Sequence, residues 1–480
     1  MQSNGKIDYS RKWHVMAAVG MGIFLGTIDG SIINVALPTL TRNLNTEFSV
    51  VQWVSLAYLL TMATLMLSMG RLGDMIGKKK VYVSGFVIFT LGSLLCGIAP
   101  SIFMLIAFRV FQAVGASMMT LGMAIITENF PPSERGKALG ISGSLVSIGI
   151  IAGPVIGGII LSAVSWRWIF YVNLPIGIIG TWMVLKLVPN TTEAHKERFD
   201  FLGAIIFFIS MSSLLVGLTI GQNTGFIAFM PLIFFTVGFV ALLVFIWIEK
   251  NTQFPMIDLD IFRNRLFNIN LITGMITFVT ISGTIFLMPF YLEGVLEFQT
   301  NQVGLIIASI PISMGIIAPI SGTLSDRVGS RLITIVGLAI LVVASLSLTR
   351  ISTETSAWML VLLFLPIGLG IGIFQSPNNS VILGSVPSSK LGVASGLLAT
   401  NRTLGQTTGI AVLGALWATS VTQYLNYKPD GGATNAPPEI QVEGLQIVFY
   451  VCAGILLIGL LLAIWGLIQE RRMVKEKAAI

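Results

Sequence analysis

The sequence predicts an all-α polytopic membrane protein with fourteen transmembrane helices. Of its 480 residues, 54% are hydrophobic and only 10% are charged, and the mean hydropathy is +0.88. A soluble domain spends about 25% of its residues on charged side chains, so this chain cannot cover a water-facing surface of its size. The apolar residues form long charge-poor stretches, and most Lys and Arg residues lie in the loops between them. These observations exclude a soluble, disordered or fibrous protein.

Each predicted span is a charge-poor window of roughly 20 residues, the length that crosses a bilayer core of about 30 Å. The seventh and eighth windows are divided at the Gly- and Asn-containing cluster 221–225, which is typical of a turn. The fourteen windows are 14–37, 49–69, 81–99, 102–127, 138–163, 168–188, 202–221, 226–248, 268–291, 303–322, 332–349, 357–383, 392–417 and 446–468.

The loop charges predict the orientation. When loops are assigned alternately to the two sides, most of the 28 Lys and Arg residues fall on the side of the N-terminus. Because cytoplasmic loops carry the excess of these residues, we predict a plasma (cell inner) membrane protein with both termini cytoplasmic. The run after residues 1–12 is too long for a signal peptide and has no cleavage site, so it is interpreted as the first span. The other side receives only Arg42, Arg167, Arg350 and Lys428.

Few residues of this chain are suited to catalysis or to metal binding. Cys96 and Cys452 lie in apolar runs and only two histidines occur, so no metal or cofactor site is predicted. No ATP-binding phosphate loop occurs, and the net charge of +7 lies in loops rather than in a nucleic-acid-binding patch. His195 and Asp200 match an H-x-x-x-x-D acyltransferase spacing, which leaves a membrane-embedded acyltransferase as a remote alternative. Any uphill transport must therefore use an ion gradient.

Two loops on the predicted cytoplasmic side repeat one motif. Residues 70–80 read GRLGDMIGKKK and residues 322–331 read GTLSDRVGSR, so Gly, Leu, Asp and Gly recur at one constant offset. The segment 132–135 (PSER) matches 387–390 (PSSK) near the same offset. Duplicated halves are typical of secondary transporters, in which two bundles move around a central site. Six repeated spans, with spans seven and eight inserted between them, account for all fourteen.

Further motifs occur in the order expected for one known family. Residues 28–38 (IDGSIINVALP) resemble its first-helix signature, with Ser31 in place of Thr. Arg109, Gln112 and Gly115 resemble its fourth-helix motif, with Ala113 in place of Gly, and WRWIF and NLP follow at 166–170 and 173–175. The chain therefore resembles, nearly end to end, a major facilitator superfamily transporter of the fourteen-helix drug:proton antiporter branch (EmrB/QacA type). The glycines and proline that resemble the branch's antiporter motif are Gly149, Gly153, Pro154, Gly157 and Gly158.

The resemblance implies the major facilitator fold, with two pseudo-symmetric six-helix bundles plus two inserted helices. The chain then divides into a segment 1–12, a first bundle 13–190, an inserted pair with linkers 191–266, a second bundle 267–468 and a tail 469–480. The resemblance also implies that the duplicated turns latch the outward-open state at a cytoplasmic gate, whereas the simpler interpretation is a tight solvated turn. The gate residues are Gly70, Arg71, Asp74, Gly77, Lys78, Arg135, Gly322, Asp326, Arg327, Gly329 and Arg331.

Three ionisable residues fall inside predicted spans, where charges are costly and usually functional. Asp29 and Arg109 each lie nine residues from a proline at the end of their span, or roughly 13 Å at 1.5 Å per residue. Arg402 lies at nearly the same depth. The implied fold makes the first and fourth helices neighbours, so Asp29 could pair with Arg109. We hypothesise that Asp29 binds the driving proton and Arg109 tunes it, with a structural ion pair as the alternative.

The net charge of these three residues restricts the class of substrate. One acid and two arginines leave it at +1, which disfavours dications and leaves lipophilic anions, zwitterions and weakly basic amphiphiles open. Polar residues nearby could line a substrate cavity or could equally hold helices together by hydrogen bonds. The cavity candidates are Asn34, Gln112, Gln375, Asn378, Asn401, Arg402 and Gln406.

Two rows of glycine recur every fourth residue. Gly22, Gly26 and Gly30 form one, and Gly149, Gly153 and Gly157 form the other. Such a stripe lets a neighbouring backbone approach closely. Pro154 removes a helix hydrogen bond and permits a bend, so the second row predicts helix packing, a gating hinge, or both.

These observations together predict a proton-coupled exporter of lipophilic drugs or toxic compounds that works by alternating access and is not an enzyme. Its expected partners are a small lipophilic substrate and the bilayer, with the proton as coupling ion and no ATP, nucleic acid or cofactor. An exporter or facilitator of an endogenous metabolite or organic anion is the alternative. An accessory periplasmic partner is left open.

Overall fold

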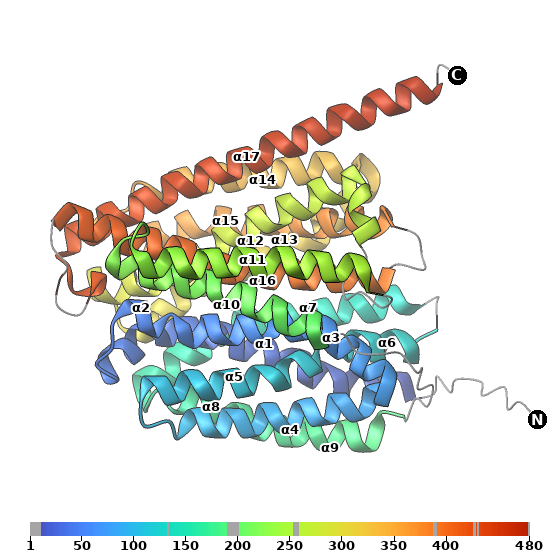
Figure 1. The fold of residues 1–480 in the computed structure, drawn as a ribbon, viewed down its shortest axis with the longest axis horizontal. Coiled ribbons are helices and arrows are strands. Elements are labelled where there is room, and N and C mark those ends of the chain that lie inside the picture. Colours follow the sequence, from blue (N-terminus) through green and yellow to red (C-terminus); the bar gives the residue numbers. More distant parts are fainter. Residues whose placement is uncertain are drawn as a thin grey trace, which may run out of the picture.

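The computed structural model describes residues 11–131, 134–189, 201–252, 259–386, 391–425, 429 and 432–478. All regular secondary structure in these ranges is helical, as the all-α prediction requires. The long helices run side by side across one elongated body (Figure 1). They are α1 (Lys12–Asn43), α3 (Trp53–Ile76), α4 (Lys78–Gly97), α5 (Ile102–Met119), α7 (Arg135–Ala163), α9 (Asn173–Leu187), α10 (Phe201–Thr224), α11 (Phe229–Asn251), α12 (Arg265–Phe290), α13 (Thr300–Val328), α14 (Ser330–Leu348), α15 (Ala357–Gly384), α16 (Leu391–Leu425) and α17 (Pro438–Ala478).

Short helices complete or connect several spans. A bend at 120–121 separates α5 from α6, and the two together form one span, Ile102–Asn129. A π-helical turn η4 continues α12 toward the end of the body at which α1 finishes. The short elements are α2 (Phe48–Val51), α6 (Gly122–Asn129), α8 (Trp168–Tyr171), η3 (Leu259–Arg263), η4 (Tyr291–Val295) and η6 (Ala433–Asn435).

Thirteen helical segments of the described chain are long and apolar enough to cross a membrane. The predicted span 392–417 lies in α16, which is not among them although its 35 residues would extend roughly 50 Å. The polar side chains near its middle, including Asn401, Arg402 and Gln406, lower its mean hydropathy. The described chain therefore has the fourteen long helices that the sequence predicts, and thirteen of its helical segments meet the length and composition of a membrane span.

The helices form two groups. In the first, α1 packs on α7 and α9, and α4 packs on α5 and α9; in the second, α13 and α14 pack on α15, and α12 packs on α16 and α17. Figure 1 shows the two groups as separate layers. The predicted boundary between residues 266 and 267 falls inside α12, which begins at Arg265, and the boundary after 468 falls inside α17. The predicted boundary at 190–191 lies outside the described residues.

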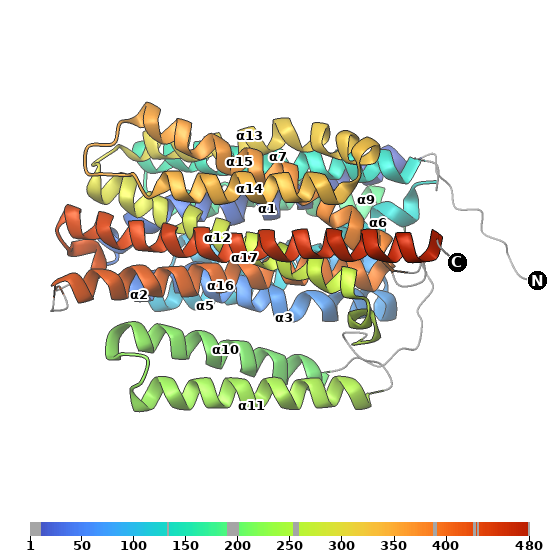
Figure 2. The ribbon, with the colours of Figure 1, turned by 90° about the horizontal axis from the view of Figure 1, so that it is seen from above.

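Helices α10 and α11 pack on each other and lie along one side of the body (Figure 2). Of the two, α10 contacts both groups, through α3 of the first and α16 of the second. The indole nitrogen of Trp53 donates a hydrogen bond to Thr219 Oγ1 over 3.2 Å, which ties α10 to α3. The inserted pair therefore covers a junction between the two groups.

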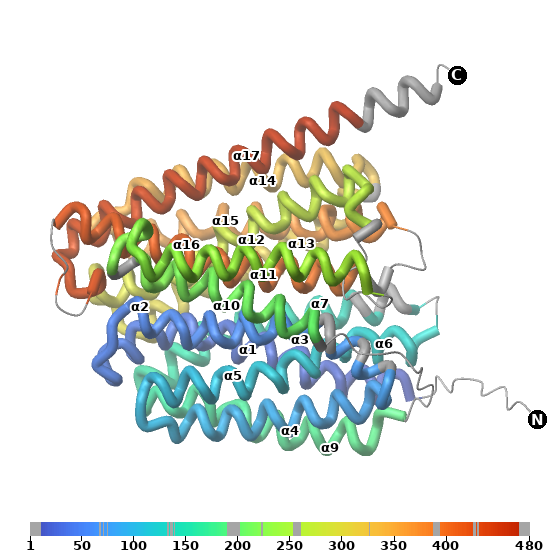
Figure 3. The backbone as a smooth tube through the Cα atoms, in the orientation of Figure 1, coloured from blue at the N-terminus to red at the C-terminus, as the bar shows by residue number. Residues whose placement is uncertain are grey.

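The two groups repeat local geometry as well as sequence. Gly77 and Gly329, in the duplicated turns, adopt φ of 99° and 98°, a left-handed conformation that only glycine adopts without strain. Both stop one helix and start the next. Figure 3 shows that α1 begins at this same end of the body and that α17 runs toward it; we call it the termini end. The opposite end, where α1 finishes and α2 lies, is called the far end.

Candidate functional site

Asp29 and Arg109 meet inside the first helix group. Asp29 lies on α1 and Arg109 on α5, and each side chain is only 1% exposed. The Nη1 atom of Arg109 donates to Asp29 Oδ2 over 2.8 Å. Two charges in an apolar interior are tolerated when they pair and when hydrogen bonds satisfy the remaining atoms. The predicted ion pair is therefore present in this structure.

Two amides complete the shell around the carboxylate. Gln112 Nε2 and Asn173 Nδ2 donate to Asp29 Oδ1 over 3.0 and 2.8 Å. Both amides also donate to the hydroxyl of Ser93, over 2.7 and 3.3 Å. Helices α1, α4, α5 and α9 are thus joined by one buried network, and Asp29 accepts from three N–H groups. This arrangement fits the ionised carboxylate, which can only accept hydrogen bonds.

The guanidinium of Arg109 is held on its other sides. Its Nε atom donates to the carbonyl of Val54 over 3.2 Å, and Nη1 also donates to Gln112 Oε1 over 2.7 Å. The ring centroid of Tyr58 lies 4.0 Å from the guanidinium carbon, a cation–π distance. Arg109 therefore retains polar contacts that do not depend on Asp29.

The predicted cavity residues occupy different environments. Gln112 is fully buried in the Asp29 network and is not exposed to any cavity. Asn34, Gln375 and Gln406 are half-buried, and the part of the chain that the structure describes offers their side chains no hydrogen-bond partner. These three side chains are therefore available to contact another molecule, whereas Gln112 is not.

A second polar group lies where α12, α15 and α16 meet. Asn401 Nδ2 donates to the carbonyl of Leu271 over 3.0 Å. A Cβ atom at Gly274 would lie 3.3 Å from Asn378 Nδ2 and 3.5 Å from Asn401 Nδ2, so the two amides flank this glycine. One turn further along α12, the ring centroid of Phe278 lies 5.7 Å from the guanidinium carbon of Arg402.

The two glycine rows differ in their packing. Gly149 and Gly153 lie directly against the side chains of Thr27 and Ser31 on α1, where a Cβ would overlap them. The hydroxyl of Ser31 also donates to the carbonyl of Gly149 over 3.1 Å. A Cβ at Gly157 would likewise lie 2.8 Å from Ile32 on α1, so the predicted close packing is confirmed for this row. The next residue, Gly158, faces α13, where a Cβ would lie 2.7 Å from the carbonyl oxygen of Thr300. The hinge role of these residues and Pro154 stays a prediction.

The prediction of close packing is wrong for most of the first row. Gly22 lies against Tyr82, but a Cβ at Gly26 or Gly30 would meet no atom of the described residues within 4 Å. The face of α1 that carries Gly26 and Gly30 is thus open, and Asn34 continues it one turn later. Open space beside the middle of α1 is compatible with a substrate path.

The predicted gate residues lie at the termini end. Lys78 forms an ion pair with Glu128 that links α4 to α6, and Arg331 Nη1 donates to the carbonyl of Gly466 over 2.7 Å. Gly322 faces Ser376 on α15, where a Cβ would lie 3.2 Å from its Oγ atom. Arg327 is exposed. The side chains of Arg71, Asp74, Arg135 and Asp326 lie outside the described part of the structure.

At the far end the two groups are joined by contacts that the sequence did not indicate. Arg42, at the end of α1, forms an ion pair with Glu293 of η4. Phe48 of α2 packs against Phe286, Phe290 and Trp417, with ring centroids 5.6, 5.1 and 4.9 Å away. We call these aromatic residues and the ion pair the far-end seal. It holds the first group against the second.

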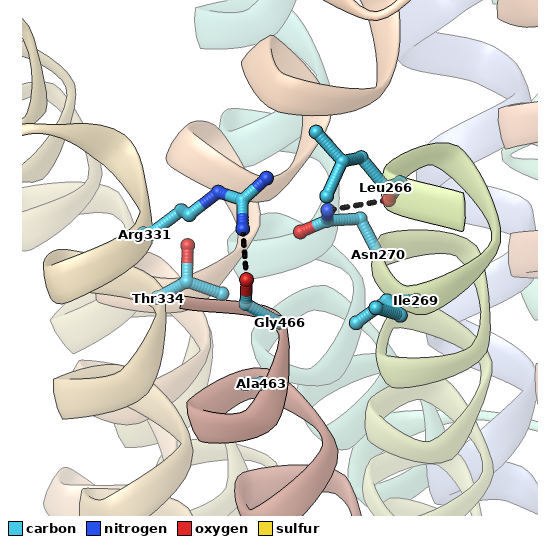
Figure 4. Close-up of a pocket in the computed structure, with 7 residues that line it drawn as sticks. All are labelled: Leu266, Ile269, Asn270, Arg331, Thr334, Ala463 and Gly466. Atoms are coloured by element: carbon cyan, nitrogen blue, oxygen red, sulfur yellow. Dashed lines mark hydrogen bonds between the residues drawn. The ribbon is translucent and has the colours of Figure 1, made fainter. Parts of the chain in front are cut away.

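One cavity in the described structure is too small for a substrate. It lies between α12, α14 and α17 and has a volume of about 10 Å³, roughly the space of a single water molecule. Figure 4 shows Arg331 reaching across it to Gly466. No group of three or more His, Cys, Asp or Glu side chains in the described ranges could hold a metal ion. His195 and Asp200 of the acyltransferase alternative lie outside those ranges.

Comparison with known proteins identifies the family. Residues 19–410 match the Major Facilitator Superfamily. The chain belongs to this superfamily. It is a multi-pass membrane protein and a secondary transporter of small molecules, not an enzyme.

Named members of the major facilitator superfamily align over most of the chain. The riboflavin transporter RibZ of Clostridioides difficile (strain 630) is 35% identical over 95% of this chain and 97% of its own length. The multidrug resistance protein Stp of Mycobacterium tuberculosis is 32% identical over 84% of this chain and 75% of its own length. A solved bacterial homologue of the human lysosomal transporter Spinster, inward-facing and unoccupied, superimposes with a TM-score of 0.67 at 16% identity, covering 96% and 98% of the two chains. At that identity the likeness shows the fold alone.

Proposed function

We propose that this chain is a drug:proton antiporter of the fourteen-helix branch that exports lipophilic compounds. The observation that carries the proposal is the buried network in which Asp29 and Arg109, both inside long helices, are joined by Gln112 and Asn173. A carboxylate at membrane depth is costly and marks a proton or substrate path. The relative named as a multidrug resistance protein supports export of drug-like molecules.

Proton binding at Asp29 gives the network two states. In the ionised state the carboxylate accepts from Arg109, Gln112 and Asn173. A proton on the carboxyl group removes its charge and turns one oxygen into a donor, so the charge-assisted bond from Arg109 weakens and the new O–H group needs an acceptor. Arg109 keeps its contacts with Val54 and Tyr58 in either state. Protonation would therefore loosen α1 from α5 and α9 without leaving Arg109 unpartnered.

Alternating access would open and close the far-end seal. We assign the termini end to the cytoplasm and the far end to the outside of an inner-membrane protein, following the loop charges. Opening to the outside requires Arg42 to separate from Glu293 and the ring of Phe48 to leave Trp417. The duplicated turns at the termini end would then latch, and the glycines of α7, which face both α1 and α13, would act as the hinge.

The proposal is tested by flux in proteoliposomes with an imposed pH gradient. Ethidium, a lipophilic cation, serves as one probe, and an aromatic zwitterion and an aromatic anion complete the panel. Asp29→Asn should abolish gradient-driven flux of every transported probe but retain exchange of labelled for unlabelled probe, which needs no proton. Ser93→Ala, a change at the edge of the network, should reduce coupling far less. If gradient-driven flux survives Asp29→Asn, Asp29 is not the residue that binds the driving proton.

Export or facilitated movement of an endogenous metabolite is the second candidate. It is favoured by the riboflavin transporter RibZ, which aligns over 97% of its length. In the same proteoliposomes, riboflavin flux that is independent of the pH gradient would support a facilitator. Riboflavin flux driven by the gradient would support a proton-coupled metabolite exporter, and absence of riboflavin flux would exclude this vitamin as the substrate.

A further inference from the structure

We infer that the second helix group carries a binding site for an anionic group of the substrate, centred on Arg402 and completed by Asn378. The inference rests on the proposed transport function and names its substrate class: an aromatic compound bearing a carboxylate or a similar oxyanion. It follows from which charges in the membrane layer have partners in this structure and which do not.

Arg402 is the membrane-depth charge without a counterion. Asp29 and Arg109 neutralise each other over 2.8 Å. Arg402, at a similar depth on α16, makes no hydrogen bond and no ion pair within the described part of the chain. Its guanidinium makes a cation–π contact with the ring of Phe278. A guanidinium has five N–H donors. In this surrounding its charge and its donors are left for another molecule to satisfy.

Asn378 supplies a second, independent observation. Its side chain is only 2% exposed, its Oδ1 atom has no hydrogen-bond partner, and no donor bond from its Nδ2 atom is recorded within the described ranges. A buried amide without partners costs free energy, so such a group usually serves a ligand or a water molecule. Its Nδ2 atom lies beside Gly274, on the same stretch of α12 that carries Phe278.

The geometry fits a flat molecule with a negative edge. The guanidinium of Arg402 lies over the ring of Phe278. One turn earlier on α12, Gly274 brings the backbone close to the amides of Asn378 and Asn401. Arg402 and Gln406 are one turn apart on α16 and both are half-buried. A carboxylate can accept two parallel N–H bonds from a guanidinium, the strongest type of hydrogen bond available here. Bound there, it would neutralise the remaining charge of the layer.

A matched set of three aromatic probes tests the inference on the purified full-length protein. They are 2-naphthoate (anion), 2-naphthamide (neutral, same shape) and 2-naphthylmethylammonium (cation), each measured by equilibrium dialysis. Naphthoate should bind at least about tenfold more tightly than the amide, the equivalent of about 1.4 kcal/mol. The cation should bind most weakly. Equal affinity of wild-type protein for the anion and the amide would overturn the inference.

Substitutions test whether the preference for naphthoate depends on Arg402. Arg402→Gln should remove the preference for naphthoate, whereas Arg402→Lys, which keeps the charge but loses the two-bond geometry, should retain part of it. Asn378→Leu should weaken naphthoate binding to a smaller extent. Arg350→Gln is the matched control because it removes the same charge from an exposed residue after α14 and should leave binding unchanged. Unchanged naphthoate affinity in correctly folded Arg402→Gln would also overturn the inference.

Flux measurements separate this inference from the proposed antiport. If ethidium flux is driven by the pH gradient but naphthoate does not bind at Arg402, the antiporter stands and the anion site falls. If naphthoate binds through Arg402 but no probe responds to the gradient, the anion site stands and proton coupling falls. If naphthoate does not bind through Arg402 and no probe responds to the pH gradient, both proposals are wrong.

Discussion

The two helix groups share a scaffold but differ in polar chemistry at the same depth. A Cβ added at Gly85 on α4 would lie 2.9 Å from the carbonyl oxygen of Gly115 on α5, and one added at Gly337 on α14 would lie 2.9 Å from that of Gly370 on α15. Yet the first group encloses an arginine that is paired with a carboxylate, whereas the second presents an arginine with no described counterion. Duplication preserved the backbone contacts that build each bundle. The polar side chains diverged, which is compatible with one group handling the proton and the other the substrate.

The largest expected effect comes from removing one partner of the Asp29–Arg109 ion pair in the first helix group. Arg109→Gln leaves the buried Asp29 carboxylate without its counterion, and removing one partner of a buried pair costs about 3–5 kcal/mol. We expect a large fall in the thermal unfolding temperature of the purified protein. The double variant Asp29→Asn/Arg109→Gln contains no unpaired charge, so it should be more stable than the single variant. The opposite order would show that the pair contributes little to folding.

A second prediction concerns the shared scaffold. A Cβ at Gly115 would overlap the backbone nitrogen of Phe89, and one at Gly337 would lie 2.7 Å from that of Phe374. Gly115→Ala and Gly337→Ala should therefore each destabilise the fold, by about 1–3 kcal/mol. Gly30→Ala is the control because a Cβ there meets nothing within 4 Å. Thermal unfolding that ranks Gly30→Ala with the other two would contradict the packing described here.

The far-end seal is predicted to have a moderate effect on conformation. The Arg42 side chain is 57% exposed but Glu293 is only 2% exposed, so Arg42→Gln leaves a buried carboxylate unpaired in the sealed state. Water around Arg42 reduces the effect to about 1–2 kcal/mol. Spin labels on the exposed residues Asn45 and Glu354 should report a larger population of long distances in the variant.

Two controls accompany that distance measurement. The native cysteines, Cys96 and Cys452, are buried and should not take up label. Arg350→Gln changes the same charge at an exposed position and should leave the distance distribution unchanged. A distribution in Arg42→Gln identical to that of the wild type would show that the aromatic contacts alone close the far end.

The smallest expected effect on stability comes from replacing Arg402 in the second helix group. Arg402→Gln removes a charge that no described residue compensates, so it should leave the unfolding temperature unchanged or raise it slightly, in contrast to Arg109→Gln. Its effect should be on substrate preference instead. A fall in stability as large as that of Arg109→Gln would mean that Arg402 is needed for folding.

Much of the fold and half of the site could be predicted because they depend on local patterns. Charge-poor windows located the helices, and the repeated turns identified the duplicated halves. The depth of Asp29 and Arg109 could be counted along their helices. Nothing in the sequence predicted that Asn173 and Ser93 belong to the network. Asn173 lies in a recognised motif but had no predicted partner, and Ser93 is one of many hydroxyl residues in apolar helices.

By itself, the sequence determined the membrane environment, the helices, the duplication and the presence of ionisable groups at mid-depth, because hydropathy, helix rise and motif spacing are properties of neighbouring residues. Only the tertiary structure decided which of those groups are paired. Two glycine rows with the same spacing show why: Gly153 is pressed against α1 while Gly30 faces open space. Burial, pairing and access depend on which helix lies opposite, and that is a property of the assembled bundle.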